Sequence, residues 1–94
     1  NNHKFPTTSY IYTIKILLLD KAYSEALFLS EKALKTAKQK SGFFPNKRSE
    51  ALLFFGIGKI YDAMNEKEKA DHYKTLAGNL YSPQALEERW SVRE

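Results

Sequence analysis

The spacing of four alanines constrains the fold of this chain more than any other feature of its sequence. Ala26 and Ala33 lie seven residues apart, and a shift of 44 residues brings them onto Ala70 and Ala77, which have the same spacing. Seven residues is nearly two turns of an α-helix, so the two alanines of each pair face the same way. Side chains this small let a neighbouring backbone approach closely along that line. The spacing therefore predicts two helices that pack closely against others along one side.

Helical periodicity and turn residues divide the chain into five expected helices. They span residues 10–19, 22–40, 47–64, 66–81 and 83–93. Gly42 and Asn65 suit the left-handed conformation that ends a helix, and Pro83 suits the first helical position. The segment 10–19 is rich in β-branched residues, but no other segment offers it a pairing strand. We therefore predict an all-α protein of antiparallel hairpins with short connections.

The 44-residue shift also aligns large side chains with large side chains: Tyr10 with Phe54, Leu17 with Tyr61 and Leu29 with Tyr73. In the second copy, the segment Phe54-x2-Ile57-Gly58-x2-Tyr61 is followed by Ala70 and Ala77. This series resembles the tetratricopeptide repeat, whose pattern is W-x2-L-G-x2-Y, then A-x3-F, then P. The resemblance assigns a structural signature to Tyr10, Tyr23, Ala26, Ala33, Phe54, Gly58, Tyr61, Ala70, Tyr73 and Ala77.

The first copy departs further from the family pattern than the second. It has Ile14 in place of the glycine, and Lys38 stands where the family has proline. Ser30 and Lys74 are polar where the family has a large residue four positions after the first small one. The period of 44 residues exceeds the usual 34 and resembles the long-period variants of kinesin light chains and of the peptide-pheromone receptors of Gram-positive bacteria.

The resemblance implies tandem antiparallel helical hairpins, a TPR-like α-solenoid. We expect one domain over residues 1–94, with a first hairpin at 8–43, a second at 47–81, and a helix at 83–94. That last helix is either a cap or the first helix of a third unit. Since the chain opens with Asn1 and ends inside an expected helix, we expect it to be part of a longer protein.

The resemblance also implies a groove for a peptide or partner protein, because such families bind ligands on a concave face lined by the first helix of each hairpin. The expected groove residues are Ile11, Tyr12, Lys15, Leu18, Leu19, Leu52, Phe55, Lys59 and Asp62. Lys15 and Lys59 share one repeat position, and two lysines suit an extended peptide with an acidic group or a C-terminal carboxylate. Alternatively, the lysines are ordinary solvated residues. Leu18, Leu19 and Leu52 are then covered by neighbouring helices or by further repeats, or mark a dimer or intramolecular interface.

The residues that catalysis and cofactor binding usually need are scarce. The 94 residues contain no cysteine, and the two histidines, His3 and His72, have no paired carboxylate spacing. We therefore expect no metal site, no catalytic triad, no cofactor and no enzymatic activity. The lack of cysteine fits an intracellular, cytoplasmic location, and the longest apolar runs are too short to cross a membrane.

The net charge of +4 permits acidic partners without requiring them. A basic cluster is formed by Lys32, Lys35, Lys38, Lys40, Lys47 and Arg48. Cations near a helix end also complement its dipole, and no aromatic motif accompanies the cluster, so nucleic-acid binding is not expected. The leading hypothesis is a module that binds a peptide or a protein. The alternatives are the peptide-sensor portion of a bacterial transcription regulator, and a scaffold subunit or homo-oligomer in which Leu86 and Trp90 cover an interface.

Overall fold

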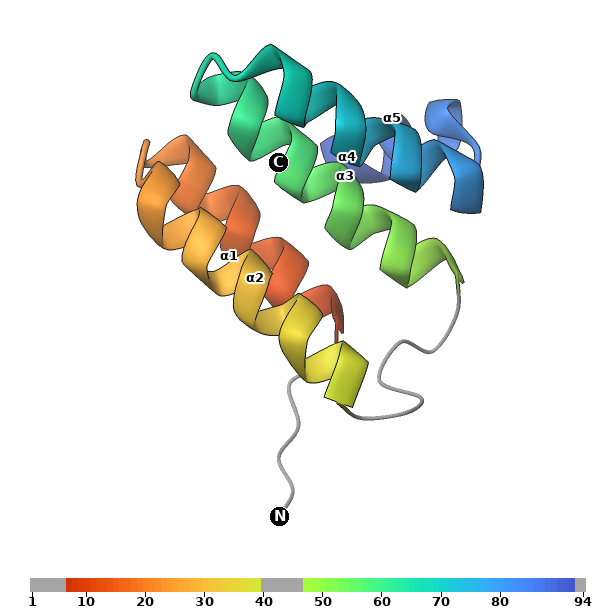
Figure 1. Ribbon diagram of the computed structural model, residues 1–94, viewed down its shortest axis with the longest axis horizontal. Coiled ribbons are helices and arrows are strands. Elements are labelled where there is room, and N and C mark those ends of the chain that lie inside the picture. The colour runs from red at the N-terminus through yellow and green to blue at the C-terminus, as the bar shows by residue number, and fades with distance from the viewer. Residues whose placement is uncertain (1–6, 40–46, 93–94) are drawn as a thin grey trace.

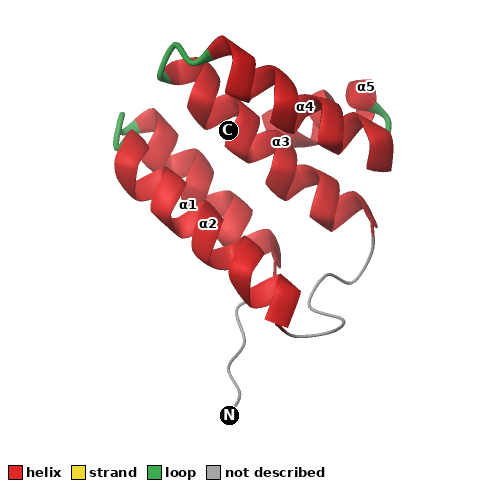
Figure 2. Cartoon of the chain, in the orientation of Figure 1, coloured by secondary structure: helices red, strands yellow, loops and turns green. Residues whose placement is uncertain are grey.

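The computed structural model describes residues 7–39 and 47–92, which form five helices. They are α1 (Thr7–Leu19), α2 (Tyr23–Gln39), α3 (Lys47–Ala63), α4 (Lys67–Leu80) and α5 (Pro83–Val92). No strand occurs within the described ranges (Figure 2), so the prediction of an all-α chain is confirmed. The predicted ends hold to within one residue, except that α1 begins at Thr7 instead of Tyr10. His3, Lys40 and Gly42 lie outside the described residues.

The turns that close the two hairpins have the same backbone geometry, 44 residues apart. Lys21 and Asn65 both adopt a positive φ, of 62° and 68°. In each turn two N–H groups donate to carbonyls of the preceding helix: Lys21 to Leu18, Ala22 to Leu17, Asn65 to Asp62 and Glu66 to Tyr61, at 2.8–3.0 Å. This pair of bonds defines the Schellman motif. The prediction for Asn65 is confirmed, whereas the left-handed Lys21 has no sequence signal, because lysine rarely adopts that conformation.

Helix α3 is the central element of the fold. It packs against each of the other four described helices, and α1 and α2 also pack against each other. Figure 1 shows α1 and α2 on one side of α3, α4 on the other side, and α5 behind α3 and α4. Within the described part of the chain, neither α1 nor α2 has an extensive interface with α4. The helices therefore form an open stack around α3.

Two apolar clusters fill the core, and α3 contributes to both. One joins α1, α2 and α3 through Ile14, Ala26, Ala33, Leu53 and Ile60. The other joins α1, α3, α4 and α5 through Ile11, Ala51, Leu52, Phe55, Ala77 and Leu86. All four alanines of the seven-residue spacing are at most 1% exposed. Their burial places the line of small side chains inside helix contacts, as the spacing predicts.

Gly58 lies where α4 comes closest to α3. A Cβ atom at this position would lie 2.7 Å from Cγ of Lys74 and 3.2 Å from the carbonyl oxygen of Ala70. The 44-residue shift places Ile14 and Ser30 at the positions equivalent to Gly58 and Lys74, and both are fully buried. The first hairpin thus has its large side chain on the first helix and its small one on the second. The second hairpin reverses the two.

The exchange explains why two polar residues occupy positions where the repeat pattern has large apolar ones. The Ser30 hydroxyl donates a hydrogen bond of 2.8 Å to the carbonyl oxygen of Ala26 on its own helix. A buried hydroxyl is therefore satisfied without a partner from another helix. Lys74 instead lays its aliphatic stem over Gly58 and keeps its ammonium group at the surface.

Replacement of Gly58 by alanine is expected to destabilise the chain, although alanine is the better helix former. The added methyl group cannot fit beside the Lys74 stem and the Ala70 carbonyl without moving them, and overpacking of this kind costs about 1–3 kcal/mol. Urea unfolding followed by far-UV circular dichroism measures the loss. In the background of Lys74→Ala the same glycine replacement should cost less. An equal cost in both backgrounds would show that the lysine stem is not the obstacle.

Candidate functional site

Helix α5 lies across the face that α1 and α3 share. Its Leu86 is fully buried in a cluster with Ile11 of α1 and with Leu52 and Phe55 of α3. Trp90, one turn further along α5, packs edge-on against Phe55 with ring centroids 6.0 Å apart. Because Leu86 and Trp90 are four residues apart, they project from one side of α5. That apolar side covers the α1–α3 face.

Gly56 makes room for the indole ring of Trp90. A Cβ atom at Gly56 would lie 3.0 Å from Cη2 and 3.1 Å from Cζ3 of the indole, and 3.9 Å from Cγ2 of Ile14. The ring therefore rests directly on the backbone of α3, near the side chain that α1 contributes. Trp90 is partly buried and packs against both core clusters. Any larger residue at position 56 would have to displace the ring.

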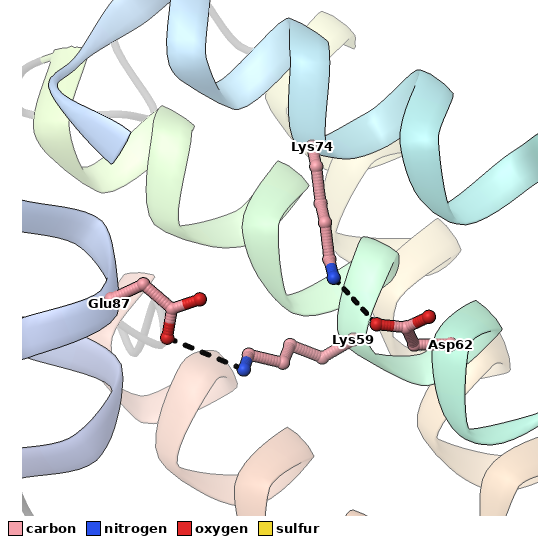
Figure 3. Close-up of polar contacts among 4 residues, drawn as sticks. All are labelled: Lys59, Asp62, Lys74 and Glu87. Carbon is pink, nitrogen blue, oxygen red and sulfur yellow. Dashed lines mark hydrogen bonds and ion pairs between the residues drawn. The ribbon is translucent and has the colours of Figure 1, made fainter. Parts of the chain in front are cut away.

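The two lysines at one repeat position both contact α5. Lys15 Nζ lies 5.5 Å from the centroid of the Trp90 ring, a cation–π contact. Lys59 Nζ lies 3.6 Å from Oε1 of Glu87 (Figure 3) and 5.2 Å from the centroid of the Phe55 ring. The Lys59 and Glu87 side chains are 29% and 60% exposed, so water screens this ion pair and it contributes little energy.

The structure brings most of the predicted groove residues together around α5. Ile11, Leu52 and Phe55 are buried beneath it, at 8%, 8% and 4% exposure. Lys15 and Lys59 flank it through the contacts above. The chain itself supplies an acidic group to Lys59, through Glu87, and an aromatic ring to Lys15, through Trp90. The sequence placed Leu86 and Trp90 on one helix face but did not reveal where that face packs. Nothing in the sequence distinguished Glu87 from the other acidic residues.

The remaining predicted groove residues lie elsewhere. Leu18 is partly buried against the cluster that contains Ile14. Tyr12 and Leu19 are 57% and 78% exposed, and Ile16, between them on the same side of α1, is 45% exposed. Ile16 is not among the predicted groove residues, although it lies four residues after Tyr12 and three before Leu19. These three side chains form an apolar stripe on α1.

Asp62 faces α4. Lys74 Nζ donates a hydrogen bond of 2.6 Å to its Oδ2, as Figure 3 shows. This hydrogen bond lowers the pKa of the Asp62 carboxyl below its ordinary value, and the positive charges of Lys74, Lys67 and Lys59 act in the same direction. Asp62 therefore joins α3 to α4.

A stack of aromatic rings also joins α3 to α4. Tyr73 of α4 stacks on Phe54 and on Tyr61 of α3, with ring centroids 6.2 and 5.8 Å apart. Burial raises the pKa of both tyrosine phenols above its ordinary value, and the negative charge of Glu31 on α2 adds to the shift. These residues belong to the predicted repeat signature. Their stacking gives them a packing role between the two helices.

In the described ranges, histidine, aspartate and glutamate do not gather in a group of three that could hold a metal ion. Within the same ranges no helix has the length and apolar character to cross a membrane. Of the predicted basic cluster, Lys32 and Lys35 line a shallow hollow on α2 with Phe28 and Glu31. The carboxylate in this hollow offsets part of its positive charge.

No protein-family model, no curated protein and no solved structure matches this chain. Inference about its function therefore rests on the residues and contacts described above.

The replacement Gly56→Ala is expected to loosen α5, because the new methyl group would lie 3.0 Å from the indole ring, and the ring would have to shift to relieve that close contact. Trp90 is the only tryptophan in the sequence, so its fluorescence should shift to longer wavelength as the ring meets water. Gly78→Ala is the matched control, since a Cβ at Gly78 would make an ordinary contact of 3.5 Å with Pro83. The control should leave the emission unchanged and raise stability by about 0.5–1 kcal/mol through helix propensity. Unchanged emission in Gly56→Ala would contradict the packing of Trp90 on α3.

The replacement Asp62→Asn is expected to destabilise the fold at neutral pH by less than about 1 kcal/mol, because the ion pair with Lys74 is partly exposed. The folded-state pKa of Asp62 is lowered, so its stabilising effect is present above the unfolded-state pKa and is lost as pH falls through the folded-state pKa. The difference in unfolding free energy between the two proteins should therefore shrink below about pH 4. Urea unfolding at a series of acid pH values measures it. A difference that stays constant down to full protonation would contradict the prediction.

Proposed function

We propose that this chain is a TPR-like helical-repeat module that binds a peptide or a protein segment on the face of α1 and α3. One observation carries the proposal: this face already holds a helix, α5, by burying its leucine and contacting its tryptophan. The same face contacts the acidic side chain of that helix through Lys59. A surface that recognises apolar, aromatic and acidic groups within one segment has the chemistry of a helix-binding groove.

Three features of the packing support the repeat interpretation. The Schellman turns recur after 44 residues, at the same interval as the alanines. The first hairpin packs against α3 with both of its helices, as one unit packs against the next in a stacked array. The described residues also show no extensive interface between α4 and the first hairpin, whereas a closed four-helix bundle would bring such helices together.

The chemistry of the face favours binding over catalysis. Its floor is apolar, with Ile11, Leu52 and Phe55 beneath α5, and the polar groups at its edge are the ammonium ions of Lys15 and Lys59. An ammonium group at the edge of an apolar floor can attract a carboxylate from a ligand. The face offers no histidine or paired carboxylates for proton transfer.

A displayed library of random peptides, selected on the full 94-residue chain, tests this proposal. The selected peptides should carry acidic residues beside apolar ones, and their affinity should fall about tenfold or more for the chain with Lys15→Glu and Lys59→Glu. A chain with Lys67→Glu and Lys69→Glu is the matched control, because both lysines are exposed at the start of α4. It should retain the affinity. A selection that yields only peptides indifferent to the first pair of substitutions would overturn the proposal.

A further inference from the structure

We propose that α5 is a displaceable ligand held in cis, and that the partner of the α1–α3 face is an amphipathic helix of the same chemistry. That helix presents a leucine and an aromatic residue four apart, with an acidic residue next to the leucine, and it binds by taking the place of α5. The inference rests on the proposed function and names its ligand class and its regulation.

The contacts of α5 define what the partner must present. Leu86 fills the apolar floor and is fully buried, so it sets the first anchor. The indole of Trp90 occupies the space above Gly56, with Lys15 over its ring, and sets the second. Glu87 follows the leucine and meets Lys59. A leucine and a tryptophan separated by one helical turn are the pattern by which a short helix docks in a groove.

Helix α5 is attached weakly enough for a competing helix to displace it. Tyr81 and Ser82 alone connect it to α4. At its first turn the Ser82 hydroxyl accepts a long bond of 3.4 Å from the Ala85 N–H, and the Ser82 carbonyl accepts one of 3.0 Å from the Leu86 N–H. The ion pair that flanks it is open to water. The extensive interface of α5 is with α3, and Leu86 and Trp90 are the α5 side chains that join the core cluster there.

Removal of α5 would leave most of the other helix contacts in place. The cluster of α1, α2 and α3 consists of buried residues from those three helices, with Trp90 only packed against its edge. The pairing of α3 with α4 is held by Ala70 beside Gly58, by the Lys74–Asp62 bond and by the Tyr73 stack. None of these contacts involves α5. The face can therefore exist in a covered and an uncovered state.

Covalent linkage makes α5 a strong competitor. A segment joined by a short connection has an effective concentration on the order of millimolar at its site. A separate helix with the same anchors therefore binds the intact chain weakly, and it binds tightly once the anchors of α5 are weakened. The two affinities can be compared directly, because a peptide with the sequence of α5 serves as the separate helix.

The test uses a fluorescein-labelled peptide with the sequence of residues 82–92 and the full 94-residue chain, with fluorescence anisotropy as the readout. The peptide should bind the Trp90→Ala chain about tenfold or more tightly than the wild type. A peptide whose leucine and tryptophan are both replaced by alanine should not bind either protein. Equal affinity of the first peptide for both proteins, or binding of the alanine peptide, would overturn the inference.

Two further variants keep the test decisive. Glu87→Lys replaces a weak ion pair by a weak repulsion at an exposed site without emptying the core, so it should raise peptide affinity by a small factor, about two- to fivefold, even if circular dichroism shows that Trp90→Ala unfolds the chain. Adding Gly56→Ala to either variant crowds the indole position and should reduce the peptide affinity again. If Glu87→Lys leaves the affinity unchanged, or if Gly56→Ala does not reduce it, the inference fails.

The proposed function can stand or fall separately. Library-selected peptides that depend on Lys15 and Lys59 should also shift the Trp90 emission of the wild-type chain to longer wavelength, because they expel the indole. Peptides that depend on the two lysines but leave the emission unchanged would support binding on the face and would overturn the displacement of α5.

Discussion

The close approach of neighbouring helices to the backbone of α3 is the constraint on which the rest of the fold depends. Gly56 and Gly58 lie two residues apart, which turns them about 200° from each other around the helix. One admits the indole of Trp90, and the other admits the stem of Lys74 and the carbonyl of Ala70. Each glycine weakens the helix by about 1 kcal/mol relative to alanine. The packing gained on two nearly opposite sides of α3 offsets that cost and lets one helix hold four others.

The central position of α3 also determines the composition of the face that it forms with α1. Leu52 and Phe55 of α3 pack with Ile11 of α1, and together they form a band with an apolar floor, edged by Lys15 and Lys59 and covered by α5. An uncovered band of this composition would be a large apolar surface in water, which folded chains tend to cover. The amphipathic side of α5 does so with two anchors. The proposed ligand would cover the same band with the same kinds of side chain.

Most of the helical architecture could be read from the sequence, and the position of the last helix could not. The alanine pairs mark places where only a small side chain fits, and Asn65 marks a left-handed backbone. Both requirements are local, so the sequence alone predicts the close helix contacts and the turn. The placement of α5 is decided by which side of α3 offers a fit to Leu86 and Trp90. That fit involves Ile11, far away in the sequence, and the missing side chain of Gly56. Of the groove positions transferred from a repeat pattern, Ile11, Leu52 and Phe55 lie beneath α5, while the placement of α5 and the pairing of Asp62 with Lys74 depended on three-dimensional packing.

The exchange of large and small residues between the hairpins limits which helices of the chain could be recombined. Gly58 makes room for the Lys74 stem, whereas at the equivalent positions of the first hairpin the large Ile14 and the small Ser30 are both fully buried. In a chimera that joined α1 to α4, Ile14 would stand at the position where Gly58 admits the Lys74 stem, and the two bulky side chains would compete for that space. The hairpin, rather than the single helix, is then the smallest piece that can be duplicated, transplanted or recombined without a compensating substitution.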